Sequence, residues 1–166
     1  MTKTQAIVAP PAVGEGKRGA HGHLGYLLRQ AGTVHRVHVE HVLCDLQVTL
    51  PQFAVLTMLD AYPGQSNADL ARLALLTPQT LSVIVTNLEK MGAVSRRAHA
   101  VHGRIQQLDL TQAGRELLAQ AKVRVYAVEQ ELMTGLSPDE ERTVRRWLVQ
   151  VATLHASTPR RRNRSV

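Results

Sequence analysis

The stretch SNADLARLALLTPQTLSVIVTNLEKMG, residues Ser66–Gly92, decides the fold because it encodes two short helices in tandem. Ser66 to Asp69 resemble a capping box, which opens the first helix. Thr77 is a typical N-cap and Pro78 suits the first helical position, so a second helix begins there. Gly92 can adopt the left-handed conformation that ends it. Two short helices in this order predict a helix-turn-helix.

The second of these helices has two unlike faces. Its apolar side chains recur at the spacing of one buried stripe: Leu81, Ile84, Val85 and Leu88. The opposite face is largely neutral and polar, and we expect it to read base edges through Gln79, Ser82, Val83, Thr86 and Asn87. Glutamine can pair with adenine, hydroxyl groups adapt to several bases, and Val83 or Pro78 can meet a thymine methyl group. We expect Thr77, Thr80 and Lys90 to contact phosphates, which position the protein without specifying sequence.

The flanking segments complete a mainly α fold with a small β-wing. Two short strands are predicted around a polar loop centred on His102-Gly103, and a hairpin directly after a recognition helix is a wing. The wing carries Arg96 and Arg104, whose charge suits the negative potential of a minor groove. The predicted elements are helices at 24–46, from Pro51 to Pro63-Gly64, from Thr111 to Leu132 and from Ser137 onward, with strands at 93–96 and 105–110.

The amino-acid composition indicates which binding partners and which cellular compartment to expect. The chain has 166 residues, 44% of them hydrophobic and only 3% aromatic, which disfavours stacking on single-stranded nucleic acid. A net charge of +7 favours an anionic partner, nucleic acid first. The single cysteine excludes an intrachain disulfide, and the absence of an apolar run or a secretory signal predicts a cytoplasmic protein without a membrane segment. Residues 1–22 are expected to form a flexible arm, 23–155 the folded domain and 156–166 a disordered basic tail.

The ordered motifs resemble the MarR family of winged helix-turn-helix regulators over about residues 24–155. They are LPQFAVL at 50–56, DLA at 69–71, LEKMG at 88–92, Arg96 with Arg104, LTQAGR at 110–115 and GLS at 135–137. The resemblance implies a homodimer joined through residues 23–46 and 112–155, with the winged helix-turn-helix at about 50–111. It also implies binding to pseudo-palindromic double-stranded operator DNA, usually with repression that a small ligand or an oxidant releases.

This sequence departs from the family pattern in two places. His102 stands where the family usually has a wing aspartate, and His99-Ala100 replace an Asp-Pro pair. On the recognition helix, Val83 and Asn87 replace basic residues that are common in relatives. The helix is therefore expected to use hydrogen bonds and methyl contacts rather than arginine–guanine pairs.

The first helix supplies candidate effector contacts. Relatives bind small molecules between this helix, the second helix and the DNA-binding lobe, and Tyr26, Arg29 and His35 could meet an aromatic acid or a phenol there. Arg29 is the natural carboxylate partner because its guanidinium group can bind both oxygens. We therefore predict a repressor released by such an effector, with no cofactor. The sequence contains none of the motifs that mark common enzyme classes.

Three alternatives stay open: a redox-responsive regulator, a metal-responsive regulator and a non-specific architectural DNA-binding protein. Cys44 is expected to be a buried, inert thiol. His35, His38 and His41 advance by three residues, so the outer two diverge by about 120° around the helix and do not converge on one ion. The architectural alternative rests on the net charge and the arginine-rich tail.

Apolar positions on the terminal helices exceed what a small winged domain needs to cover itself. They include Leu117, Leu118, Val125 and Val128 on the long helix and Trp147, Leu148 and Val151 on the last. We expect an isologous dimer to bury them and to place two recognition helices about one DNA turn apart.

Overall fold

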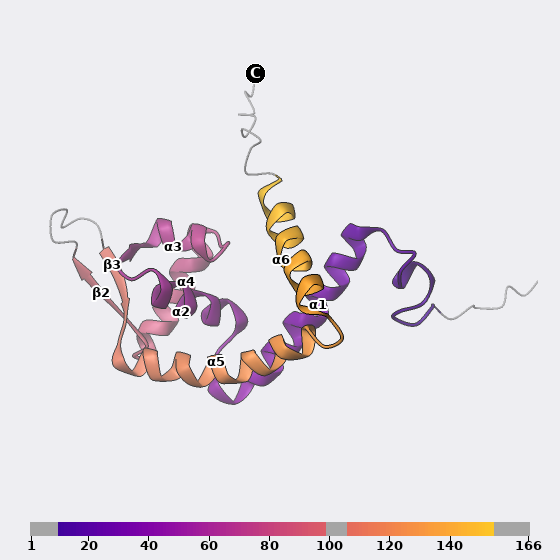
Figure 1. Ribbon diagram of the computed structural model, residues 1–166. Coiled ribbons are helices and arrows are strands. Elements are labelled where there is room, and N and C mark those ends of the chain that lie inside the picture. Colours follow the sequence, from indigo (N-terminus) through magenta and orange to yellow (C-terminus); the bar gives the residue numbers. More distant parts are fainter. Residues whose placement is uncertain (1–9, 99–105, 155–166) are drawn as a thin grey trace, which may run out of the picture. The chain divides into compact units, whose positions relative to one another are not determined.

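The computed structural model describes residues 10–98 and 106–154, and Figure 1 shows the course of the chain. It divides into two compact units, Met1–Val128 and Glu129–Val166, each of which is considered by itself. The elements follow in the order η1 (Gly16–Arg18), α1 (Leu24–Leu43), η2 (Cys44–Leu46), α2 (Leu50–Ala61), β1 (Gln65–Ser66), α3 (Asn67–Leu73), α4 (Pro78–Lys90), β2 (Val94–Ala98), β3 (Gln106–Leu110), α5 (Gln112–Leu132) and α6 (Pro138–Thr153).

The tandem helices α3 and α4 form as the sequence predicts. The Ser66 hydroxyl accepts a hydrogen bond from the backbone N–H of Asp69 at 3.2 Å and caps α3. The Thr77 hydroxyl accepts one from the N–H of Thr80 at 3.1 Å and caps α4. Gly92 follows α4 with φ +70°, a left-handed conformation that glycine adopts without steric cost.

The small sheet has three antiparallel strands in the order β1-β3-β2. Strands β2 and β3 form the predicted hairpin, with Val94 opposite Leu110 and Ala98 opposite Gln106. The prediction missed β1, whose two residues pair with β3. A two-residue strand is too short to show an alternating pattern, so only the fold reveals it.

A first apolar cluster holds the winged unit together. The buried stripe of α4 packs into it as predicted, because Leu81, Val85 and Leu88 are each fully buried. Side chains from α2, α3, the hairpin and the start of α5 complete the cluster. Burial of this stripe fixes which face of α4 remains outside.

A second cluster joins α1 and η2 to α5. Val39 and Leu43 pack with Ala121, Val125 and Val128, all buried within one protomer. Leu118 is buried in the first cluster. The expectation that these α5 side chains exceed what one chain can cover is therefore wrong: contacts within the chain account for them.

The segment around α2 differs from the prediction in detail. The α-helical part of the first helix ends at Leu43, and a 3-10 turn follows. Helix α2 begins at Leu50 rather than Pro51, because Thr49 is its N-cap and forms a reciprocal capping box with Gln52. Cys44 is exposed, which contradicts the buried thiol expected from the sequence.

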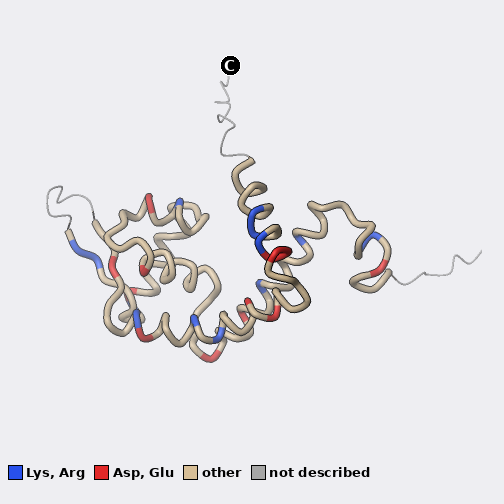
Figure 2. Tube along the Cα trace, viewed as in Figure 1, with Lys and Arg blue, Asp and Glu red and all other residues tan. Residues whose placement is uncertain are grey.

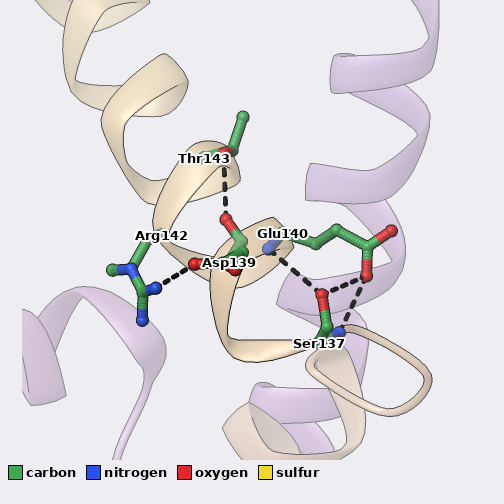
Figure 3. Close-up of polar contacts among 5 residues, drawn as sticks. All are labelled: Ser137, Asp139, Glu140, Arg142 and Thr143. Carbon is green, nitrogen blue, oxygen red and sulfur yellow. Dashed lines mark hydrogen bonds and ion pairs between the residues drawn. The ribbon is translucent and has the colours of Figure 1, made fainter.

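Helix α6 begins with the predicted capping box, drawn in Figure 3. The Ser137 backbone N–H donates to Glu140 Oε2 at 2.8 Å, and the Ser137 hydroxyl donates to the same oxygen at 2.7 Å. Both bonds hold the pKa of Glu140 below its ordinary value, and the bond from the Ser137 hydroxyl has the larger effect. No residue of α6 is buried, and its large apolar side chains Val144, Trp147, Leu148 and Val149 keep 36–64% of their surface exposed.

Within residues 10–98 and 106–154, no single helix combines the length and apolar character needed to cross a membrane; only two sharply bent helix pairs reach that composition together.

Candidate nucleic-acid interface

The outward face of α4 is the candidate reading surface. Every predicted contact residue on this helix is exposed, and Val83 keeps 62% of its surface accessible. A shallow depression of about 360 Å³ runs along the face, lined by Ser82, Val83, Thr86, Asn87 and Lys90. The structure thus brings together the residues that the sequence places on this stripe. Methyl and hydroxyl groups dominate the surface, which suits base-edge contacts more than charge-driven binding.

Hydroxyl groups on this helix are held by local hydrogen bonds. The Ser82 hydroxyl donates to the Pro78 carbonyl at 2.9 Å, and the Thr86 hydroxyl donates to the Ser82 carbonyl at the same distance. The hydroxyl oxygens of Thr77 and Thr80 lie 2.9 Å apart at the start of the helix. These groups are therefore ordered before any ligand arrives.

Strand β2 carries two adjacent arginines, Arg96 and Arg97, seen as the blue stretch of β2 in Figure 2. Arg96 Nε lies 2.7 Å from Glu89 Oε1 of α4, so the predicted wing contact is tied to the recognition helix. Arg97 Nε lies 2.5 Å from Asp109 Oδ2 of β3. Sequence reasoning missed both carboxylate partners, because the Arg96 pair depends on how β2 folds against α4 and the Arg97 pair is a diagonal contact set by the hairpin register. Arg104, His99 and His102 lie outside the described residues.

Asp109 links the hairpin to the turn before β1. Its Oδ1 accepts a hydrogen bond from the Gly64 backbone N–H at 3.1 Å while Oδ2 holds Arg97. Gly64 has φ +74°, which favours glycine in that turn. One carboxylate therefore joins β2, β3 and the α2–β1 connection, and it sets the base from which the wing leaves.

The end of α4 is fixed to the start of α5. The Thr111 hydroxyl donates to the Gly92 carbonyl at 2.6 Å, and its backbone N–H donates to the Ala93 carbonyl at 3.1 Å. The same hydroxyl accepts from the Gly114 N–H at 2.9 Å, which confirms Thr111 as the cap of the long helix. Recognition helix, hairpin and α5 thus share one junction.

A short network orients α3. The Ser66 hydroxyl donates to Asp69 Oδ2 at 2.5 Å, and Arg72 forms an ion pair with the other carboxylate oxygen. The hydrogen bond from Ser66, followed by that from Arg72, lowers the pKa of Asp69. Asp69 is therefore ionised at neutral pH.

The candidate effector residues on α1 do not all meet. The Arg29 guanidinium carbon lies 5.7 Å from the centre of the Tyr26 ring, so these side chains form a cation–π pair. His35 follows Tyr26 by nine residues, which places it about 180° around the helix. The structure thus joins two of the three predicted residues and sets the third on the opposite side.

The histidines of α1 bear on the metal-responsive alternative. His38 and His41 are exposed, while His35 is half-buried. In the described part of the chain, no three histidine, cysteine, aspartate or glutamate side chains gather closely enough to hold an ion.

Two short helices followed directly by an antiparallel hairpin define the winged helix-turn-helix proteins, which bind duplex DNA. The model of the MarR family matches residues 48–105, which include α2, α3, α4 and β2. A curated relative, the HTH-type transcriptional repressor Rv2887 of Mycobacterium tuberculosis, is 38% identical over 130 residues, which are 78% of this chain and 94% of the relative. The chain belongs to the MarR family: it is a DNA-binding transcriptional regulator and not an enzyme.

Solved structures agree with this assignment. The transcriptional repressor CouR, bound to a 23-mer DNA duplex, matches with a TM-score of 0.73 and 30% identity, over 78% of this chain and 92% of that one. Rv2887 in complex with p-aminosalicylic acid matches with a TM-score of 0.64 and 37% identity, over 79% and 99% of the two chains.

Proposed function

We propose that this protein is a homodimeric repressor that binds a pseudo-palindromic operator and leaves it when a small aromatic acid or phenol binds. The observation that carries the proposal is the exposed, neutral polar face of α4 with Arg96 of β2 tied to the same helix. Such a face discriminates bases only when it enters a major groove. CouR was solved bound to a DNA duplex, which supports duplex binding by this fold.

The proposed contacts fall into two groups. Base edges meet the middle of α4, through Gln79, Ser82, Val83, Thr86 and Asn87, with Pro78 beside them. Phosphates meet the ends of α4 through Thr77, Thr80 and Lys90, and the charge of Arg96 and Arg104 draws the wing to a minor groove. The first group sets sequence preference and the second sets overall affinity and salt dependence.

Dimerisation is proposed through residues 23–46 and 112–155. Helix α6 supports this because none of its residues is buried, while Trp147 remains 36% exposed and Leu148 43%. Large apolar side chains left uncovered along a helix usually mark an interface. An isologous dimer would cover them and present two copies of α4 to successive half-sites.

The effector proposal rests on the Tyr26–Arg29 pair. The ring orients the guanidinium group, which could bind a carboxylate while the aromatic side chain contacts the ligand ring. Rv2887 was solved with p-aminosalicylic acid, an aromatic acid of this kind. His35 lies on the other side of α1 and is not part of this pair.

DNA binding is tested by competition at fixed salt. The protein should prefer a duplex that it selects from a random library over a scrambled duplex of the same composition by at least about a thousandfold. Equal binding to both would favour the architectural alternative. Replacement of Arg104 by alanine should weaken binding to most duplexes and lower the salt slope by about one, since one charge-dominated contact is lost.

Effector release is tested with Arg29→Ala. This variant should bind the selected duplex with nearly unchanged affinity but should no longer respond to salicylate, whereas the matched control Arg36→Ala, an exposed arginine of the same helix, should respond normally. A wild-type response of Arg29→Ala would exclude the carboxylate role of Arg29. If peroxide rather than an aromatic acid released the wild-type protein from the duplex, the redox-responsive alternative would be favoured. Release by a divalent cation would favour the metal-responsive alternative.

A further inference from the structure

The Ser82 hydroxyl on α4 is held from two sides. It donates its only proton to the Pro78 carbonyl at 2.9 Å, one turn earlier on the same helix. It accepts a hydrogen bond from the Asn67 side-chain amide, Nδ2 to Oγ 3.1 Å, at the start of α3. The neighbouring helix therefore fixes this hydroxyl, although Ser82 is exposed on the reading face.

These bonds leave the Ser82 oxygen as an acceptor. A hydroxyl has one proton and two lone pairs, and here the proton and one lone pair are engaged. In the major groove, the donors that can meet the remaining lone pair are the exocyclic amino groups, adenine N6 and cytosine N4. Guanine and thymine present carbonyl oxygens at the corresponding positions, which a lone pair repels.

The packing of α3 alone does not explain why an asparagine occupies position 67. Its other amide atom, Oδ1, is buried and has no hydrogen-bond partner among the described residues. A buried carbonyl oxygen without a partner destabilises the folded state. An alanine at this first position of α3 would avoid that cost, so the amide must be useful for the contact that it makes, which is the one to Ser82.

We propose that Asn67 is a positioning residue that, together with the Pro78 carbonyl, holds Ser82 as a hydrogen-bond acceptor, so that the protein selects adenine over guanine, or cytosine over thymine, at one operator position. The proposal rests on the proposed reading of base edges by α4. Without the Asn67 amide, the Ser82 side chain can turn to another rotamer and donate to a carbonyl oxygen. Discrimination at that position then falls.

The test uses the full chain and a duplex that wild type selects from a random library. Each adenine or cytosine of the duplex is replaced in turn in two ways. One replacement is the other base of the same ring size, guanine for adenine or thymine for cytosine. The second is an analogue of the original base that lacks the exocyclic amino group. At one position per half-site, wild type should lose about five- to tenfold in affinity with both replacements, the effect of one hydrogen bond. Ser82→Ala and Asn67→Ala should each abolish this loss at the same position, and the double variant should show no further change.

Two controls separate positioning from general destabilisation. Gln112→Ala removes a side-chain amide that donates to Glu116 one turn further along α5, away from the reading face, and it should keep the wild-type preference. Melting temperatures show whether each variant is folded. If Asn67→Ala does not fold, Asn67→Ser provides the same test, because serine suits a helix start but is too short to reach Ser82.

The outcomes are distinguishable. If wild type enriches no duplex, the proposed function fails and this inference fails with it. If wild type selects a duplex but the position sensitive to Ser82 carries guanine or thymine, the acceptor assignment is wrong while the regulator stands. An Asn67 variant that retains the wild-type preference, or whose effect adds to that of Ser82→Ala, overturns the positioning role.

Discussion

Gly114→Ala tests whether the junction between α4 and α5 holds the winged unit together. Gly114 lies in the first turn of α5, where a Cβ atom would come within 1.9 Å of the Ala93 carbonyl oxygen and 2.8 Å of its carbonyl carbon. A carbon–oxygen contact needs about 3.3 Å, so the two backbone segments would have to separate by more than about 1 Å. Because the obstructing atoms are backbone, no side-chain rotation relieves the clash.

The cost follows from the contacts that this separation disturbs. Overpacking of a core costs about 1–3 kcal/mol. The hydrogen bond from Thr111 N–H to the Ala93 carbonyl and the one from its hydroxyl to the Gly92 carbonyl weaken as well, at about 1 kcal/mol each. Alanine recovers about 1 kcal/mol through its helix propensity. We expect a net loss of about 2–4 kcal/mol in the free energy of unfolding.

The matched control is Gly32→Ala in the middle of α1, where an added Cβ has no neighbour within 4 Å. That variant should gain up to about 1 kcal/mol through helix propensity alone. Urea unfolding at one fixed protein concentration, followed by circular dichroism, measures both changes. An unfolding midpoint for Gly114→Ala at or above that of wild type would show that the junction yields easily, and the argument would be wrong.

Three further changes test the local structure. Leu75 has φ +57° and is 92% exposed, so Leu75→Gly should relieve left-handed strain and raise the unfolding free energy by about 0.5–1 kcal/mol in the same urea assay. Asp109→Ala removes the carboxylate that holds Arg97, so it should lower the melting temperature by a few degrees and weaken DNA binding in a fluorescence titration. Ser137→Ala should lower the melting temperature by about 3–5 °C at pH 7. The folded-state pKa of Glu140 is depressed, so the stabilisation that its carboxylate provides is present above its ordinary pKa of 4.5 and is lost as the pH falls below that value. The difference in melting temperature between Ser137→Ala and wild type should therefore shrink in acid.

Local signals made most of the fold predictable. Caps at Ser66, Thr77, Thr111 and Ser137 each depend on residues within four positions, and the structure confirms all four. The buried stripe of α4 follows from its spacing alone. Short-range chemistry thus located the recognition helix and the face that it exposes.

Long-range contacts were not predictable in the same way. The pairing of Arg96 with Glu89 depends on how the hairpin folds back on α4, and the strand β1 exists only because β3 lies beside it. Leu75 occupies a left-handed turn where the sequence offers no glycine, so no residue preference marks it. The α-helical path ends at Leu43, three residues before the predicted end, and Cys44 stands exposed in the 3-10 turn that follows.

The packing of α5 explains how the two proposed sites could influence each other. Phe53 and Leu117 contact both apolar clusters, the one that contains α4 and the one that joins α1 to α5. A ligand held by Arg29 would act on α1, and a shift of α1 against α5 would strain these shared side chains, because a close-packed core does not deform gradually. The Thr111 junction then passes the displacement to α4 and the hairpin. The coupling required is modest, typically about 1–3 kcal/mol, and by reciprocity operator DNA must weaken effector binding by the same factor. The shared side chains would therefore give the proposed switch a physical route within one folded unit.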